Sequence, residues 1–173
     1  MPARCFSNLL FGAVLCSSLA CAGEPSLKDA ETAWNSGDVP GALAQWQALA
    51  ERGDIIAANN LGYLYENGVG VQKDYGKALH WYRKVAEAGA PIGQYNLGSA
   101  YLAGRGVEPD PVEAAKWLTL AAAGGVPEAR AALAKLEPQL TKEQLGEARL
   151  RAVQWRSDKQ REFARKQRNA PKN

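Results

Sequence analysis

Apolar residues recur at helical spacing along most of the chain. Within residues 55–66, Ala58, Leu61, Leu64 and Tyr65 fall three or four positions apart, and no run of β-branched residues follows the first two. Spacing of three and four places these side chains on one face of an α-helix. The pattern therefore predicts a helix over residues 55–66 with one apolar face.

The same pattern returns 36 residues later. Residues 58–91 align with residues 94–127 without an insertion. The matched pairs, which we expect to build the structural repeat, are Leu61 and Leu97, Gly62 and Gly98, Tyr65 and Tyr101, Gly68 and Gly104, Gly70 and Gly106, Asp74 and Asp110, Ala78 and Ala114, Trp81 and Trp117, and Gly89 and Gly125. A weaker copy begins near Asp38, and a half copy includes Leu133. A period of this length predicts stacked units of secondary structure with atypical end units.

Each unit is expected to contain two helices. Gly68 and Gly70 predict the end of the first helix in a tight turn that needs positive φ. Asp74 predicts the N-cap of the second helix. In the next unit, residues 110–113 supply Asp at the cap, Pro at the first helical position and a Glu that could complete a capping box. Gly89 is expected to end the second helix.

Small residues predict where the paired helices approach each other. Gly62 has no side chain, and we expect it and its copy to face Ala78 and its copy, with Trp81 filling the space beside them. One helical pair cannot bury its apolar face alone, so the units are expected to stack. The fold class predicted from these features is all-α, an α-solenoid of antiparallel helical hairpins.

The repeated residues resemble a known family. The motif LG-x-x-Y-x-x-G-x-GV-x-x-D, followed by A-x-x-W, is similar to the Sel1-like repeat, a relative of the tetratricopeptide repeat, over about residues 42–136. The resemblance implies a right-handed solenoid that acts as a scaffold or adaptor, as an exported protein in many bacterial members. From its residues the chain is expected to hold no cofactor and no metal and to have no enzyme activity.

The resemblance also implies a binding groove. In tetratricopeptide repeats the first helix of each hairpin lines the concave face. The corresponding groove residues, expected to contact a protein or peptide partner, are Asn59, Tyr63, Glu66, Tyr95 and Ser99. Amide, hydroxyl and aromatic groups together suit an extended peptide. The alternative is that these side chains are solvated surface and shared repeat packing.

The N-terminus predicts an export signal. Arg4, a short apolar core over residues 9–15 and an A-x-A pattern ending at Ala22 form the layout of a secretory signal peptide. All three cysteines precede Gly23, so cleavage would leave none. We therefore expect a periplasmic or secreted protein. The alternative is a lipoprotein anchored at Cys21.

The C-terminal region differs from the repeats. Thr141 predicts the cap of a further helix, in which Leu145 to Trp155 are expected to pack on the last hairpin. The predicted domains are a signal peptide (1–22), a helical repeat solenoid (23–140) and a capping helix with a basic tail (141–173). Residues 23–148 carry 11 Lys and Arg against 16 Asp and Glu, whereas residues 149–173 carry nine against two. The tail is either a solvated helix or a contact for an acidic surface, such as anionic lipid or a partner protein; nucleic acid is not expected as a partner.

Composition limits the chemistry of the chain. Its 173 residues are 46% hydrophobic, without the roughly 20 apolar residues in a row that a membrane span needs. Its single histidine, His80, has no candidate nucleophile or metal-binding companion, and Lys116 occupies the equivalent position. The favoured function is a non-catalytic scaffold. The alternatives are a cell-wall-directed enzyme or β-lactam-type ligand binder, suggested by cysteine-rich relatives, and a regulator of an envelope enzyme.

Overall fold

The computed structural model describes residues 24–170, and this part contains eight α-helices, one 3₁₀ turn and no strand. The predicted signal peptide and all three cysteines lie outside the described residues. The elements are α1 (Leu27–Asn35), α2 (Val39–Glu51), α3 (Ile55–Asn67), α4 (Tyr75–Glu87), α5 (Pro91–Ala103), α6 (Pro111–Ala123), α7 (Pro127–Leu136), η1 (Glu137–Gln139) and α8 (Lys142–Arg168).

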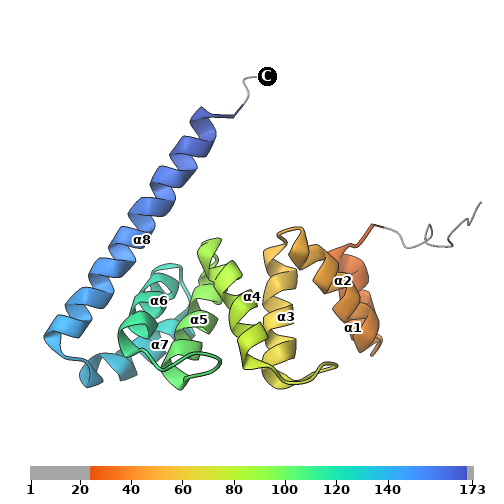
Figure 1. Cartoon of the computed structure of the whole chain (residues 1–173), viewed down its shortest axis with the longest axis horizontal. Helices are drawn as coiled ribbons and strands as arrows, with labels where there is room; N and C mark the ends of the chain where they lie inside the picture. The colour runs from red at the N-terminus through yellow and green to blue at the C-terminus, as the bar shows by residue number, and fades with distance from the viewer. Residues whose placement is uncertain (1–23, 171–173) are drawn as a thin grey trace, which may run out of the picture.

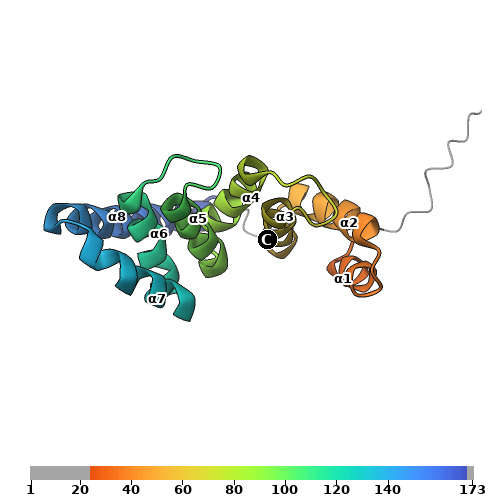
Figure 2. The same cartoon turned by 90° about the horizontal axis from the view of Figure 1, so that it is seen from below.

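The helices pack in chain order to form an elongated row. Each helix from α1 to α7 contacts the next along the chain, and α8 packs along α6 (Figure 1). Viewed from below, α1 and α7 project on the same side at opposite ends of the row (Figure 2). The predicted all-α solenoid of hairpins is confirmed.

The two central hairpins repeat in their caps as well as in their sequences. Gly68 and Gly104 end α3 and α5 in the left-handed conformation, with φ of 71° and 67°. Asp74 and Asp110 cap α4 and α6, each accepting hydrogen bonds from backbone N–H groups of the first turn. The predicted capping box at Glu113 is wrong, because its carboxylate instead accepts hydrogen bonds from Lys116 and from Arg151 of α8.

The second glycine of each turn joins neighbouring hairpins. Gly70, with φ of 69°, lies beyond the end of α3, where an added Cβ would collide with Val39 at the start of α2. Gly106 lies equivalently against Tyr75 at the start of α4, and its Cβ would stand 2.7 Å from the Tyr75 carbonyl carbon. These glycines are therefore needed for the stacking of hairpins, a role that the sequence analysis did not predict for them.

The contact within the hairpin differs from the prediction at Gly62 and agrees with it in part at Gly98, where an added Cβ would stand 3.2 Å from the backbone oxygen of Ala114. A Cβ on Gly62 would meet the Tyr82 ring of α4, with Cδ1 at 2.6 Å, and a Cβ on Gly98 would meet Leu118 of α6, with Cγ at 3.0 Å. The residue opposite each glycine thus comes one position after the tryptophan. Trp117, which is only 5% exposed, faces α8 and packs edge-on against Trp155, with ring centroids 5.7 Å apart.

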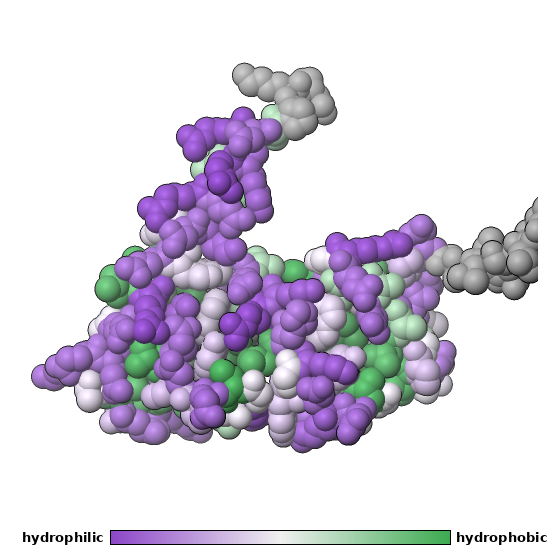
Figure 3. Space-filling view, in the orientation of Figure 1, coloured by the Kyte–Doolittle hydropathy of each residue, from purple (hydrophilic) through white to green (hydrophobic). Residues whose placement is uncertain are grey.

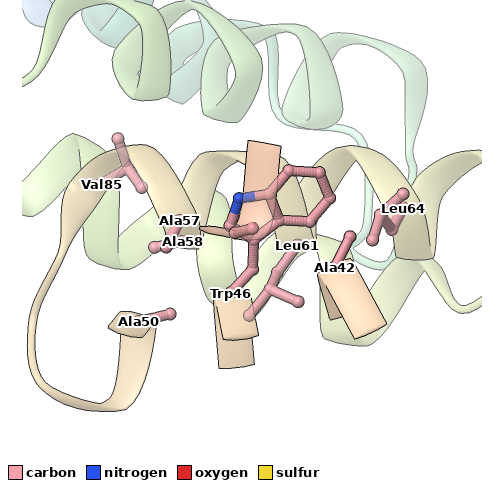
Figure 4. Packing of buried hydrophobic residues seen from close by; sticks show 9 residues of the cluster. Ala42, Trp46, Ala50, Ala57, Ala58, Leu61, Leu64 and Val85 are labelled. Carbon is pink, nitrogen blue, oxygen red and sulfur yellow. The ribbon is translucent and has the colours of Figure 1, made fainter. Parts of the chain in front are cut away.

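The core of the N-terminal half is centred on one tryptophan. Trp46 of α2 lies among small residues and leucines from α2 and α3, with Val85 of α4 at the edge of the cluster (Figure 4). Alanines at these positions let the helices approach closely, so the large ring fills the remaining space. The weak first copy in the sequence is therefore a true hairpin, α1 and α2.

The first half of helix α8 packs on the hairpins, and its C-terminal half projects from them (Figure 1). Thr141 and Gln144 form a reciprocal capping box, and Ala148 and Ala152 are buried against the hairpins. The C-terminal half of α8 rises away from the body and carries mainly hydrophilic side chains (Figure 3). The predicted helix cap is confirmed, and the helix continues to Arg168.

Candidate binding face on the first helices of the hairpins

The predicted groove residues lie on α3 and α5, which with α1 and α7 are the first helices of the hairpins. We call their exposed side chains the first-helix face. Tyr63 is 51% exposed, and three aliphatic side chains of α3 and α5 are similarly exposed: Ile56, Ile92 and Leu102. Large apolar side chains thus remain accessible along this face, which is the usual character of a surface that binds a partner.

Two predicted contact residues, Asn59 and Ser99, are partly buried between the helices. Asn59 of α3 is partly buried, and its Oδ1 accepts a hydrogen bond of 2.9 Å from Asn96 Nδ2 of α5. The amide pair links neighbouring hairpins at the centre of the face. Ser99 follows on α5 and is partly buried.

Glu66 holds three elements together. Its carboxylate accepts a 2.7 Å hydrogen bond from the Tyr82 hydroxyl of α4 and pairs with Arg105, which follows α5. Burial, together with the bond to Glu66, raises the pKa of Tyr82 well above its usual value. The Tyr82 hydroxyl is therefore protonated at neutral pH, and Glu66 acts mainly as a tie within the face.

Tyr63 lines a cavity between α1 and α3. The cavity has a volume of about 270 Å³. It is lined by Glu31, Trp34, Trp46, Asn60, Tyr63 and Leu64. The rings of Trp34 and Trp46 lie 5.4 Å apart and are tilted by 49°. We call this site the aromatic cavity.

The repeat pattern in the sequence did not predict that residues of α1 and α2 line this cavity. The repeat alignment begins near Asp38, so it assigned no role to Glu31 or Trp34. The two tryptophans, Trp34 and Trp46, on either side of a turn were the available signal.

Tyr95 lines a separate cavity at the other end of the row. This cavity, of about 360 Å³, lies between α5 and α7, and Leu102, Glu128 and Lys135 also line it. Tyr95 is partly buried against the core around α6 and α7. The predicted contact residues therefore divide into two end cavities, at Tyr63 and Tyr95, and a polar centre.

Among the described residues, the side chains able to bind a metal ion do not gather into a cluster, and the single histidine lies beside a tryptophan. No group of three or more His, Asp or Glu side chains that could hold a metal ion occurs within residues 24–170. His80 is exposed on α4 and stands edge-on to Trp81. In the same part of the chain, no helix has the length and apolar character needed to cross a bilayer.

Comparison with known proteins identifies the repeat. The family model for the Sel1 repeat matches residues 55–89 and 91–126, which are the two central hairpins. A comparison with curated proteins found no match.

Three solved structures are similar to the chain. A protective antigen present in uropathogenic Escherichia coli strains and displaying an SLR fold has a TM-score of 0.70 and 29% identity, over 84% of this chain and 33% of that one. A Sel1 repeat protein from Oxalobacter formigenes has a TM-score of 0.62 and 29% identity, over 75% and 56% of the two chains. Cysteine rich protein B of Helicobacter pylori shares the fold, with a TM-score of 0.51 and 24% identity over 64% of this chain and all of that one.

The chain spans about a third of the first of these proteins and just over half of the second. The matched repeats, the helical hairpins and the similar structures agree. The chain carries two Sel1 repeats, at residues 55–89 and 91–126, and the Sel1-repeat fold is in general a scaffold for protein–protein interaction.

Proposed function

We propose that the chain is a non-catalytic scaffold, exported to the periplasm or beyond, that binds a protein or peptide through its first-helix face. The observation that carries this proposal is the pair of cavities at Tyr63 and Tyr95, with the Asn59–Asn96 amide pair between them. The signal-peptide pattern before Gly23 supports export.

The arrangement suits an extended segment of a partner. The two cavities can take side chains, while polar groups between them can bond a peptide backbone, whose N–H and C=O groups need partners when they leave water. Exposed Ile56, Ile92 and Leu102 add apolar contact along the same face. Affinity in such interfaces is commonly concentrated in a few aromatic anchors.

Paired variants test this assignment. Partners captured from the native envelope by the wild-type protein are compared with those captured by Tyr63→Ala, Tyr95→Ala. The matched control is His80→Ala, Leu150→Ala, which removes one ring and one aliphatic side chain that are exposed outside the first-helix face.

We expect the groove variant to lose at least tenfold in affinity for a recovered partner, and the control to bind as the wild type does. Equal binding by all three proteins would show that the first-helix face is not the binding surface. Covalent labelling by a fluorescent penicillin would favour the alternative β-lactam binder.

The projecting half of α8 suggests a second contact. Residues 156–168 carry six Lys and Arg against two acids, and this segment rises away from the body (Figure 3). We propose that it contacts an acidic surface such as anionic lipid. Sedimentation with phosphatidylglycerol vesicles should fall when Arg161, Arg165 and Arg168 are replaced by Gln, and unchanged sedimentation would contradict this contact.

A further inference from the structure

The aromatic cavity carries a more specific inference about the partner. We propose that it binds a cationic side chain, a lysine or an arginine, of the peptide that occupies the first-helix face. This inference rests on the proposed function, since it names the chemistry of one part of that partner.

Three aromatic rings of the cavity lack the covering that most other rings of the protein have. A Lys or Arg of the chain lies over six of the other rings: Lys73 over Tyr75, Lys77 over Tyr65, Arg83 over Tyr101, Lys84 over Trp81, Lys116 over Trp117 and Lys159 over Trp155. Among the other rings of residues 24–170, Tyr82, Tyr95 and Phe163 have no such cation. Within residues 24–170, no such cation lies over Trp34, Trp46 or Tyr63. The negative face of an aromatic ring attracts cations, and tryptophan does so most strongly.

The rings are arranged to be reached from outside. Trp46 is 4% exposed and forms the buried wall, while Trp34 is partly exposed and Tyr63 is half exposed. The cavity of about 270 Å³ has room for one long side chain. A lysine or arginine could place its alkyl stem against the rings while its charged end stays near the polar groups of the cavity.

Glu31 supplies the matching charge. No Lys or Arg in residues 24–170 forms an ion pair with its carboxylate. Between the next pair of first helices, α3 and α5, the chain places its own Arg105 against Glu66. On this face, therefore, the Glu66 carboxylate forms an ion pair with a guanidinium group that the chain itself supplies. At Glu31 we infer that the partner supplies it.

The charge of the body favours the same partner. Residues 24–148 carry 11 Lys and Arg against 16 Asp and Glu, so a basic peptide is attracted over a longer range. A neutral apolar side chain would contact the rings but would form no ion pair with the exposed Glu31 carboxylate. The cavity should therefore discriminate by charge as well as by shape.

Two small probes isolate this discrimination. N-acetyl-lysinamide and N-acetyl-norleucinamide have alkyl chains of the same length, and only the first carries an ammonium group. Each is titrated into the full protein at low salt while the Trp34 indole N–H signal is followed by NMR. We expect the lysine probe to bind about tenfold more tightly, from cation–π contact and the ion pair together.

Matched variants then locate the effect. Glu31→Gln keeps the shape of the cavity and should reduce the lysine preference to about twofold. Glu128→Gln removes an acid from the other cavity and should leave the preference at the wild-type value. Binding of the lysine probe should also weaken as salt is raised.

The result separates this inference from the proposed function. Equal or weaker binding of the lysine probe, or no response of Trp34 to either probe, would overturn the cationic site. The proposal that the first-helix face is the binding surface would then still be tested by the Tyr63 and Tyr95 variants. Loss of the lysine preference in Glu128→Gln, with Glu31→Gln unaffected, would also overturn it.

Discussion

Gly62 offers the sharpest test of how the paired helices pack. It lies within α3, and a Cβ at this position would stand 2.6 Å from Cδ1 and 3.0 Å from Cζ of the Tyr82 ring. The ring has little freedom to withdraw, because Tyr82 is buried and its hydroxyl donates a 2.7 Å hydrogen bond to Glu66. Gly62→Ala therefore forces α3 and α4 apart or breaks that bond.

The magnitude follows from two opposing effects. Alanine in a helix interior is favoured over glycine by about 1 kcal/mol. Overpacking of a close contact costs about 1–3 kcal/mol, and loss of a hydrogen bond to a charged group costs about 1.5–3 kcal/mol. Either cost, less the gain of about 1 kcal/mol, leaves an expected net destabilisation of up to about 2 kcal/mol for Gly62→Ala.

Gly146→Ala is the matched control. Gly146 lies within α8 with nothing within 4 Å of an added Cβ, so the variant should stabilise the helix by about 0.5–1 kcal/mol. Urea unfolding followed by circular dichroism at 222 nm gives both values. If Gly62→Ala were as stable as Gly146→Ala, the close contact between α3 and Tyr82 would be refuted.

Three further results are expected. Because the pKa of Tyr82 is raised in the folded state, the free energy of unfolding should fall as pH rises above about 10, where the phenol ionises first in the unfolded state. Between pH 8 and pH 10.5 the urea midpoint should therefore fall less in Tyr82→Phe than in the wild type. An equal fall in both proteins would contradict this expectation. Arg151→Ala should lower the free energy of unfolding by about 0.5–1 kcal/mol and increase hydrogen exchange in α8, because Arg151 forms an ion pair with Glu113 of α6. As a control, replacement of the exposed Arg161 by Ala (Arg161→Ala) should not increase exchange in the part of α8 next to α6. Lys166 and Lys159 lower the pKa of Glu162, so its contribution to the helix is present at neutral pH and is lost as pH falls through that lowered value. Amide protection factors at the end of α8, which correct for the slow intrinsic exchange near pH 3, should therefore be lower at pH 3 than at pH 7 in the wild type and change less in Glu162→Gln.

Much of the fold could be predicted because it depends on local chemistry. The 36-residue period identified the two central hairpins, and glycines and aspartates marked their ends, since positive φ and N-capping restrict the residue type. Gly68 and Asp74 therefore have the predicted roles. The resemblance to the Sel1-like family rested on these same positions.

The missed features depend on geometry between helices. Which side chain faces Gly62 is set by the crossing of α3 and α4, so Tyr82 could not be distinguished from its neighbours in sequence. The aromatic cavity was missed because the turn between α1 and α2, residues 36–38, is shorter than the turn at residues 68–74, and α1 falls out of the repeat alignment. Asn59 and Glu66 lie on α3, the first helix of its hairpin, but their bonds to Asn96 and Tyr82 were not predicted.

Site-specific photo-cross-linking tests the central claim most directly. The photoreactive residue p-benzoylphenylalanine replaces Tyr63, Tyr95 or His80 in separate full-length proteins, each expressed in its native cells. The account predicts that positions 63 and 95, on the first-helix face, form adducts with the same partner while position 80 does not. An adduct at position 80 with none at positions 63 and 95 would place the binding surface on the other layer of helices and contradict the account.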